Sequence, residues 1–137
     1  MGRILAIDYG RKRVGLAVTD PLRIVANGLD TVPAKDVLEY LKKYADKETV
    51  DKIVIGLPKQ MNGEESEAMK YIRPFAGQLK KTFPGMEIVY ADERFTSVLA
   101  HKAMLDGGLK KKDRQNKALA DKISAVIILQ TYLESVR

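Results

Sequence analysis

The stretch that decides the fold is Ile4-Leu5-Ala6-Ile7-Asp8-Tyr9-Gly10-Arg11-Lys12-Arg13-Val14-Gly15-Leu16-Ala17-Val18-Thr19-Asp20. Both of its ends are short and mostly apolar, as in β-strands, and a polar loop separates them. Gly10 lies in that loop, where a glycine can adopt the positive φ that a tight turn often requires. The stretch therefore predicts an antiparallel hairpin with strands at residues 4–8 and 14–20.

The rest of the chain alternates helix and strand patterns. A third strand is expected at about residues 26–32, and a short apolar strand at residues 53–57, of the kind that a parallel sheet buries on both faces. A fifth strand is expected at residues 87–91. Helical spacing of apolar residues predicts helices at about residues 37–45, 69–83, 96–107 and 117–136, of which Pro74 should kink or split the second. This order predicts an α/β fold with a mixed five-stranded sheet, antiparallel at first and parallel later, and helices on both faces.

Length and composition fit a single domain over residues 1–137. A chain of 137 residues buries roughly two thirds of its unfolded surface, and it contains no cysteine, which excludes disulfides, zinc fingers and thiol catalysis. No segment approaches the ~20 apolar residues of a membrane span, and the apolar run at the start is too short for a signal peptide. We therefore expect a cytoplasmic protein without a membrane partner.

The net charge points to a polyanionic partner. The formal charge is +6 and the pI is about 9.5, which makes nucleic acid the first candidate. An acidic membrane surface is a weaker candidate, because no strongly basic amphipathic helix stands out.

Three acidic residues stand where strand or helix patterns begin or end: Asp8, Glu93 and Asp121. Carboxylates there are badly placed for packing and well placed to hold a divalent metal ion. Asp8 comes just before the glycine loop, so it could instead accept hydrogen bonds from loop amides as a turn cap. Its position alone leaves both interpretations open.

The second acid has a neighbour that competes for the same role. Asp92 and Glu93 end the fifth strand, and their side chains point to opposite faces, so at most one readily faces a given site. Glu93 has the longer reach and is the expected ligand, with Asp92 as the alternative; a solvated charge cluster in which Arg94 pairs with an acid is also open. If the fourth strand lies between the first and the fifth, the strands of Asp8 and Glu93 are about 10 Å apart.

Asp121 precedes a helix that is apolar nearly all round and is therefore expected to be buried. Counting four, seven and eleven residues onward gives Ala125, Ile128 and Tyr132, so Asp121 shares a stripe that should face the interior. A buried charge needs a partner. Lys122 lies roughly 100° away around the helix and is not an obvious one, whereas a metal ion would serve.

Basic residues flank these acids and complete the functional prediction. Such runs are usually solvated loops, but beside a metal centre they could hold phosphates on both sides of a scissile bond. The expected substrate-binding residues are Arg11, Lys12, Arg13, Arg94, Lys110, Lys111, Lys112 and Arg114. Together with the acids they predict a metal-dependent nuclease that uses two Mg²⁺ or Mn²⁺ ions ~4 Å apart, one preparing a water nucleophile and the other stabilising the leaving oxygen. Tyr71, Tyr90 and Tyr132 are expected in the core and not as stacking platforms for bases.

Four segments, in order along the chain, resemble the YqgF family, also called RuvX. The segments are residues 6–10 with 13–20 (AIDYG and RVGLAVTD), 53–58 with 61–63 (IVIGLP and MNG), 92–97 (DERFTS) and 121–129 (DKISAVIIL). The resemblance implies a ribonuclease H-like fold and Asp8, Glu93 and Asp121 as the metal-binding catalytic acids. In the wider resolvase fold the second acid commonly ends the fourth strand, where this chain has Gly56-Leu57-Pro58.

The same resemblance implies the substrate. Members of the family are described as nucleases that mature the 5′ end of 16S ribosomal RNA, which would make ribosomal precursor particles a partner, and as Holliday junction resolvases. RNA or branched DNA, and a monomer or a weak homodimer, both stay open. Two further alternatives are an actin-like phosphotransferase, since Asp8 to Gly15 also resembles the phosphate-binding hairpin of that fold, and a nucleic-acid-binding module without catalysis.

Overall fold

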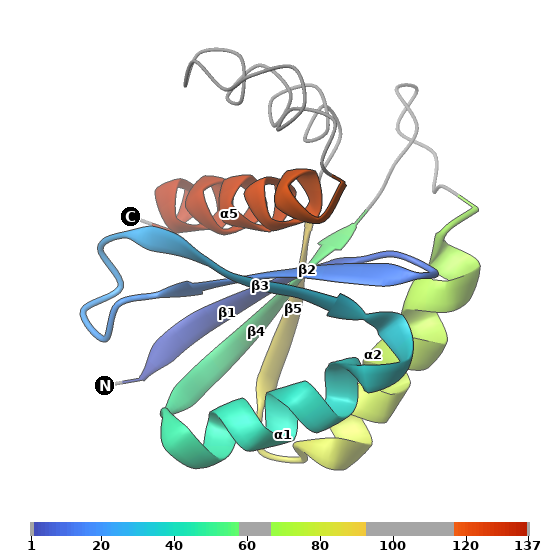
Figure 1. The fold of residues 1–137 in the computed structure, drawn as a ribbon. Coiled ribbons are helices and arrows are strands. Elements are labelled where there is room, and N and C mark those ends of the chain that lie inside the picture. The colour runs from blue at the N-terminus through green and yellow to red at the C-terminus, as the bar shows by residue number, and fades with distance from the viewer. Residues whose placement is uncertain (1, 58–66, 93–116, 137) are drawn as a thin grey trace.

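The computed structural model describes residues 2–57, 67–92 and 117–136 (Figure 1). The strands are β1 (Arg3–Tyr9), β2 (Arg13–Thr19), β3 (Ala26–Pro33), β4 (Val50–Leu57) and β5 (Glu87–Asp92), and they form one sheet in the order β3-β2-β1-β4-β5. β2 pairs antiparallel with β1 and β3, while β4 pairs parallel with β1 and β5. The predicted mixed sheet is confirmed, with β4 between β1 and β5.

Helices cover both faces of this sheet. A short 3₁₀ turn, η1 (Ala34–Asp36), leads into α1 (Val37–Lys47); α2 (Met69–Thr82) and α5 (Lys117–Ser135) follow. In Figure 1, α1 and α2 lie on one face and α5 on the other. The helix predicted at about residues 96–107 lies outside the described residues. No helix in the described part of the chain is long and apolar enough to cross a membrane.

Pro74 was expected to kink or split α2, and the split is wrong. The helix runs unbroken from Met69 to Thr82 and contains Pro74. The proline removes the hydrogen bond to the carbonyl of Lys70, four residues earlier, but both residues are exposed, so that carbonyl can turn to water. The buried face of Met69, Ile72, Phe75, Ala76 and Leu79 holds the helix on the sheet.

The larger core lies between the sheet and helices α1 and α2. Alternation along the hairpin sends Leu5 and Ile7 of β1 and Leu16 of β2 to this side, each no more than 1% exposed. A fully buried side chain of this size stabilises the fold by about 1.5–3 kcal/mol. Tyr9 continues the row and stacks on Phe75 of α2, with ring centroids 4.3 Å apart.

The opposite face carries small residues, which allow α5 to lie close to the strands. Ala6, Ala17 and Val54 are fully buried there against Ala125 and Leu129 of α5. The closest approach is at Gly15, where an added Cβ would overlap the main-chain carbonyl of Asp121. At Gly28, an added Cβ would lie 2.8 Å from Cγ of Lys122. These glycines therefore set the height of the N-terminal half of α5 above the sheet.

The C-terminal half of α5 is fixed by a polar contact. The Lys52 ammonium of β4 donates a hydrogen bond to the Tyr132 hydroxyl at 2.7 Å and lies 3.6 Å from the Glu87 carboxylate of β5. The hydrogen bond with Tyr132 is the main cause that raises the pKa of Lys52 above its ordinary value. Lys52 therefore joins α5 to the parallel side of the sheet.

Gly15→Ala tests the close approach of α5. We expect it to reduce the free energy of unfolding by about 1–3 kcal/mol, because the new methyl group forces the start of the helix away from β2. Gly77→Ala is the matched control: Gly77 is in α2 with nothing within 4 Å of an added Cβ, so alanine should stabilise by up to about 1 kcal/mol. Urea unfolding measures both variants, and a neutral Gly15→Ala would contradict the packing described here.

Candidate metal site and nucleic-acid interface

Asp8 lies at the end of β1, on the face that α5 covers. Ile4 and Ala6 of the same strand pack against α5, and the two-residue period of the strand puts Asp8 in line with them. Leu5 and Ile7, by contrast, belong to the core under α1 and α2. The side chain of Asp8 is half-buried.

Asp121 reaches the same place from the other end of the sequence. Its main chain covers Gly15, and Gly15 is the direct partner of Asp8 in the β1–β2 ladder. Neighbouring strands are ~4.8 Å apart, so the Asp121 backbone lies about one strand spacing to the side of Asp8. The structure therefore brings together two of the three predicted acids, which are separated by most of the chain.

The residues beside Asp8 across the sheet are small. Gly15 lies on one side in β2. On the other side is Gly56 of β4, the residue after Ile55, which pairs with Ile7 of β1. Gly56 in turn pairs with Ala91 of β5. From β2 to β5, Asp8 is therefore the one residue of this row with a side chain longer than a methyl group, and Thr31 of β3 follows only beyond Gly15. The small neighbours leave the Asp8 carboxylate room on the α5 side.

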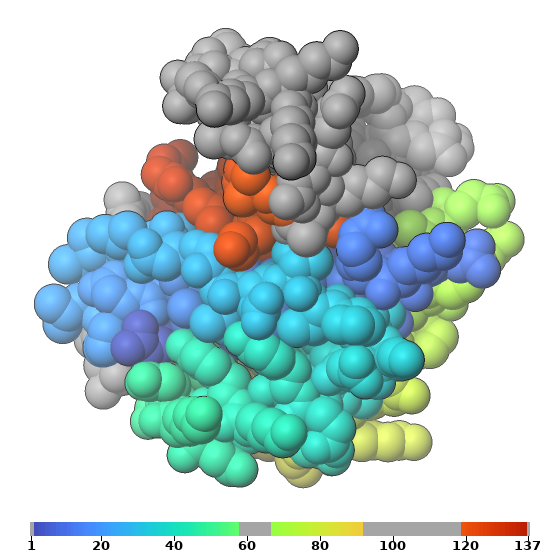
Figure 2. Space-filling view, in the orientation of Figure 1, coloured from blue at the N-terminus to red at the C-terminus, as the bar shows by residue number. Residues whose placement is uncertain are grey.

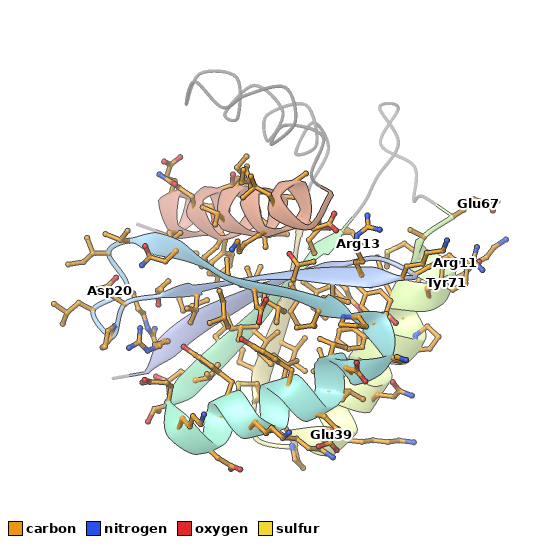
Figure 3. The ribbon with its side chains drawn as sticks, viewed as in Figure 1. Arg11, Arg13, Asp20, Glu39, Glu67 and Tyr71 are labelled. Carbon is orange, nitrogen blue, oxygen red and sulfur yellow. The ribbon has the colours of Figure 1, made fainter. Side chains whose placement is uncertain are left out.

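Asp121 has a protein partner that the sequence did not reveal. Nε of Arg13 donates a hydrogen bond to Oδ2 of Asp121 at 2.7 Å, and Figure 3 shows Arg13 beside the start of α5. The expectation of a buried carboxylate was wrong, because its side chain is 26% exposed. Ala125 and Ile128 on the same stripe are buried, as predicted, but Ile123, Val126 and Ile127 are only partly buried, so α5 is not enclosed all round.

The three cations of the hairpin loop have different surroundings. Arg13 pairs with Asp121, whereas Cζ of Arg11 lies 4.8 Å from the centroid of the Tyr71 ring in α2. Lys12 has an exposed side chain, and its carbonyl accepts a hydrogen bond from the Ala34 amide at 2.9 Å. The hairpin thus contacts α5 through one arginine and α2 through another, with Lys12 facing solvent between them.

The turn of the hairpin needs its glycine for a reason other than the predicted one. The Gly10 amide donates to the Arg13 carbonyl at 3.0 Å, which closes the loop, and an added Cβ at Gly10 would lie 2.6 Å from that same carbonyl oxygen. Gly10 does not adopt a positive φ. Steric crowding, and not backbone conformation, excludes a larger residue here.

The remaining site predictions fall on residues that are not described. Glu93, Arg94, Lys110, Lys111, Lys112 and Arg114 all lie in the range 93–116. The backbone of Asp92, the alternative ligand, pairs with Leu57 at the end of β5. Within the described ranges no group of three or more aspartate, glutamate or histidine residues could hold a metal ion. The site described here therefore consists of Asp8, Asp121 and Arg13.

The predicted burial of the tyrosines is partly wrong. Tyr71 is 41% exposed and Tyr90 is 42% exposed. Tyr132 of α5 is partly buried against the core between α5 and the sheet, and its hydroxyl accepts the hydrogen bond from Lys52. Tyr71 lies in the first turn of α2, one turn before Phe75, and is exposed although Met69 and Ile72 of the same turn are buried. Its exposed ring under Arg11 was missed because the helical pattern around it is carried by Met69 and Ile72.

Gly15 is the other functional position that pattern reasoning missed. It interrupts the apolar strand between Val14 and Leu16, and a glycine inside a strand often marks a close approach of another backbone. That signal was present in the sequence. It does not, however, reveal which segment approaches.

Comparisons with known proteins agree with this architecture. A family model described as "RuvX: Holliday junction resolvase" matches residues 2–135. A protein of Phocaeicola vulgatus is 65% identical over 135 residues, which cover 98% of this chain and 97% of that protein. One of Bacteroides thetaiotaomicron is 65% identical over 137 residues, covering 100% and 99%. Both carry the name "Putative pre-16S rRNA nuclease".

A solved structure shares the fold. The chain titled "T. thermophilus RuvC in complex with Holliday junction substrate" superposes with a TM-score of 0.59 at 15% identity, covering 99% of this chain and 96% of that one. This likeness shows the RuvC-like ribonuclease H fold, as the sequence resemblance implied. Together with the family model and relatives of full length, it leads to one conclusion: the chain belongs to the RuvX family, also called YqgF.

Proposed function

We propose that this protein is a metal-dependent endonuclease that processes the 5′ end of pre-16S ribosomal RNA. The observation that carries the proposal is the meeting of Asp8 and Asp121 at Gly15, on the face of the sheet that α5 covers. The name of the relatives that are 65% identical supports the activity and the substrate. The charge of +6 fits an RNA partner.

Asp8 and Asp121 are suitable ligands for a hard divalent cation. Carboxylate oxygens are the donors that Mg²⁺ and Mn²⁺ prefer, and the small residues Gly15, Gly56 and Ala91 leave room beside Asp8. We propose Glu93 as the third ligand, because it follows Ala91 by two residues and Ala91 lies on the α5 side of the sheet. When bound, a pair of such ions activates water and stabilises the leaving oxygen of a phosphodiester.

Arg13 compensates the charge of Asp121 within the protein itself. A cation that binds Asp121 competes with the guanidinium for the same carboxylate, and repulsion between the two positive charges favours movement of Arg13. A released Arg13 would remain beside the acids and can donate hydrogen bonds to a phosphate. We therefore propose that Arg13 leaves Asp121 when a metal ion binds there and then binds a phosphate of the substrate.

Neutralising each acid tests the metal site. Asp8→Asn, Glu93→Gln and Asp121→Asn should each abolish Mg²⁺- or Mn²⁺-dependent cleavage, because each removes a ligand charge with little change in volume. The measurement is cleavage of a pre-16S rRNA precursor beside a four-way DNA junction by purified protein. Glu39→Gln is the control, since Glu39 is an exposed acid on α1, on the opposite side of the sheet from α5 (Figure 3).

The results for the three variants and the two substrates test the metal ligands and the substrate separately. Unchanged turnover in Asp8→Asn or Asp121→Asn would refute the metal site, and loss at these two alone would move the third ligand to Asp92 or elsewhere. Asp121→Asn should change the free energy of unfolding by less than about 1 kcal/mol, because the carboxylate is partly exposed and paired with Arg13. Cleavage of the junction alone would assign the protein to branched DNA.

The basic loop makes a separate prediction. Replacing Lys110, Lys111, Lys112 and Arg114 by alanine should weaken RNA binding and leave the metal-binding affinity intact. The slope of log K against log salt is negative, and each lost phosphate contact should make it shallower by about 0.7 for a single strand. The control is alanine at Lys35, Lys42, Lys43 and Lys47, on or just before α1, which removes the same charge.

The control isolates local contacts from net charge. If both quadruple variants lower affinity and slope equally, only the overall charge matters. If the loop variant keeps the wild-type slope, residues 110–114 do not contact phosphates. The substrate path would then have to be sought at Arg11, Lys12 and Arg13.

A further inference from the structure

Two contacts join the hairpin to α2, and each involves an aromatic ring of that helix. Tyr9 stacks on Phe75 with an interplanar angle of 21°, and two residues later along the hairpin Arg11 lies over Tyr71, one helical turn before Phe75. The first contact is in the core, because Phe75 is 3% exposed. The second lies at the surface, with Arg11 exposed and Tyr71 41% exposed. The two contacts thus join the hairpin to α2 once in the core and once at the surface.

The outer contact is next to the proposed cleavage site. Arg11 and Arg13 are two residues apart, so their Cα atoms are within about 7 Å. Their side chains nevertheless contact different helices: Arg13 reaches Asp121 in α5, while Arg11 reaches Tyr71 in α2. In Figure 2 the hairpin tip, in blue, adjoins the start of α2, in yellow-green, at the surface, and Figure 3 shows Arg11 beside Tyr71.

We propose that Arg11 and Tyr71 form a stacking platform for one unpaired nucleobase of the substrate. The guanidinium of Arg11 is planar and lies over the Tyr71 ring in a cation–π contact, so part of both groups is presented to solvent side by side. Bases of single-stranded RNA stack on aromatic rings and on arginine planes of this kind. A base inside a duplex is covered on both faces by its neighbours and cannot do so.

This inference rests on the proposed nuclease function and makes it more specific. A strand that has one phosphate near Asp8 and Asp121 and passes around Lys12 can place a flanking base on Arg11. The platform then favours a single strand over a duplex close to the scissile bond. A purely structural cation–π pair would only hold the hairpin to α2 and would not respond to the presence of bases.

The experiment measures binding in the absence of divalent cations, so that no cleavage occurs. Fluorescence anisotropy gives the Kd for a short single-stranded RNA and for an abasic sugar-phosphate chain of the same length. Tyr71→Leu removes the ring, and Arg11→Lys keeps the charge but loses the planar group. Tyr71→Phe retains the ring, and Tyr90→Leu is the matched control, because Tyr90 is 42% exposed on β5.

The wild type should bind the RNA at least about fivefold more tightly than the abasic chain. Tyr71→Leu and Arg11→Lys should lose about that factor for the RNA and bind the abasic chain as before, with an unchanged salt slope for Tyr71→Leu. Tyr71→Phe and Tyr90→Leu should bind both probes like the wild type. Thermal unfolding verifies that each variant is folded.

Two results would overturn the platform. One is wild-type binding of both probes by Tyr71→Leu and Arg11→Lys, and the other is an equal loss for RNA and abasic chain, which indicates a structural role for the pair. The proposed function fails separately: base-dependent binding with no Mg²⁺- or Mn²⁺-dependent cleavage by the wild type would leave the platform intact and refute the nuclease.

Discussion

The contact between Gly15 and the main chain of Asp121 is the constraint on which the site depends. A strand residue with a side chain at this position would raise α5 above the sheet and move the Asp121 carboxylate away from Asp8. The row of small residues beside Asp8, from Gly15 through Gly56 to Ala91, serves the same end, because it leaves this corner of the sheet without bulky side chains. Core packing of α5 further along, through Ala125, Ile128 and Leu129, holds the helix in that position.

The arrangement of charges at the site follows from this packing. An aspartate brought against the sheet needs a positive partner, and Arg13 provides it. Arg13 begins β2, the hairpin strand that α5 covers, and its Nε lies 2.7 Å from Oδ2 of Asp121. The hairpin loop therefore does more than connect two strands. It supplies a counter-ion on the α5 side, an arginine over the Tyr71 ring on the α2 side, and an exposed Lys12 between them. The loop that follows the end of β1, where Asp8 lies, therefore carries three cations.

Much of the fold could be predicted because its signals are local. Apolar runs and helical spacing predict the strands of the sheet and the described helices. The position of β4 between β1 and β5 entered the sequence reasoning only as a condition, and the structure shows it. The contacts that define the site could not be predicted in this way. Arg13 and Asp121 are 108 residues apart, and no sequence pattern pairs them. Pattern reasoning treated Asp121 as buried because it assumed that an apolar helix is enclosed, whereas α5 has one face on the sheet.

The most direct test of the account is the position of Mn²⁺ in crystals of the protein, located by its anomalous scattering. We expect a peak within about 2.0–2.6 Å of carboxylate oxygens of both Asp8 and Asp121, with Arg13 Nε no longer at hydrogen-bonding distance from Asp121. A Mn²⁺ peak that contacts neither aspartate, or the absence of Mn²⁺ from Asp8 at saturating concentration, would contradict the claim that the packing at Gly15 builds a metal site.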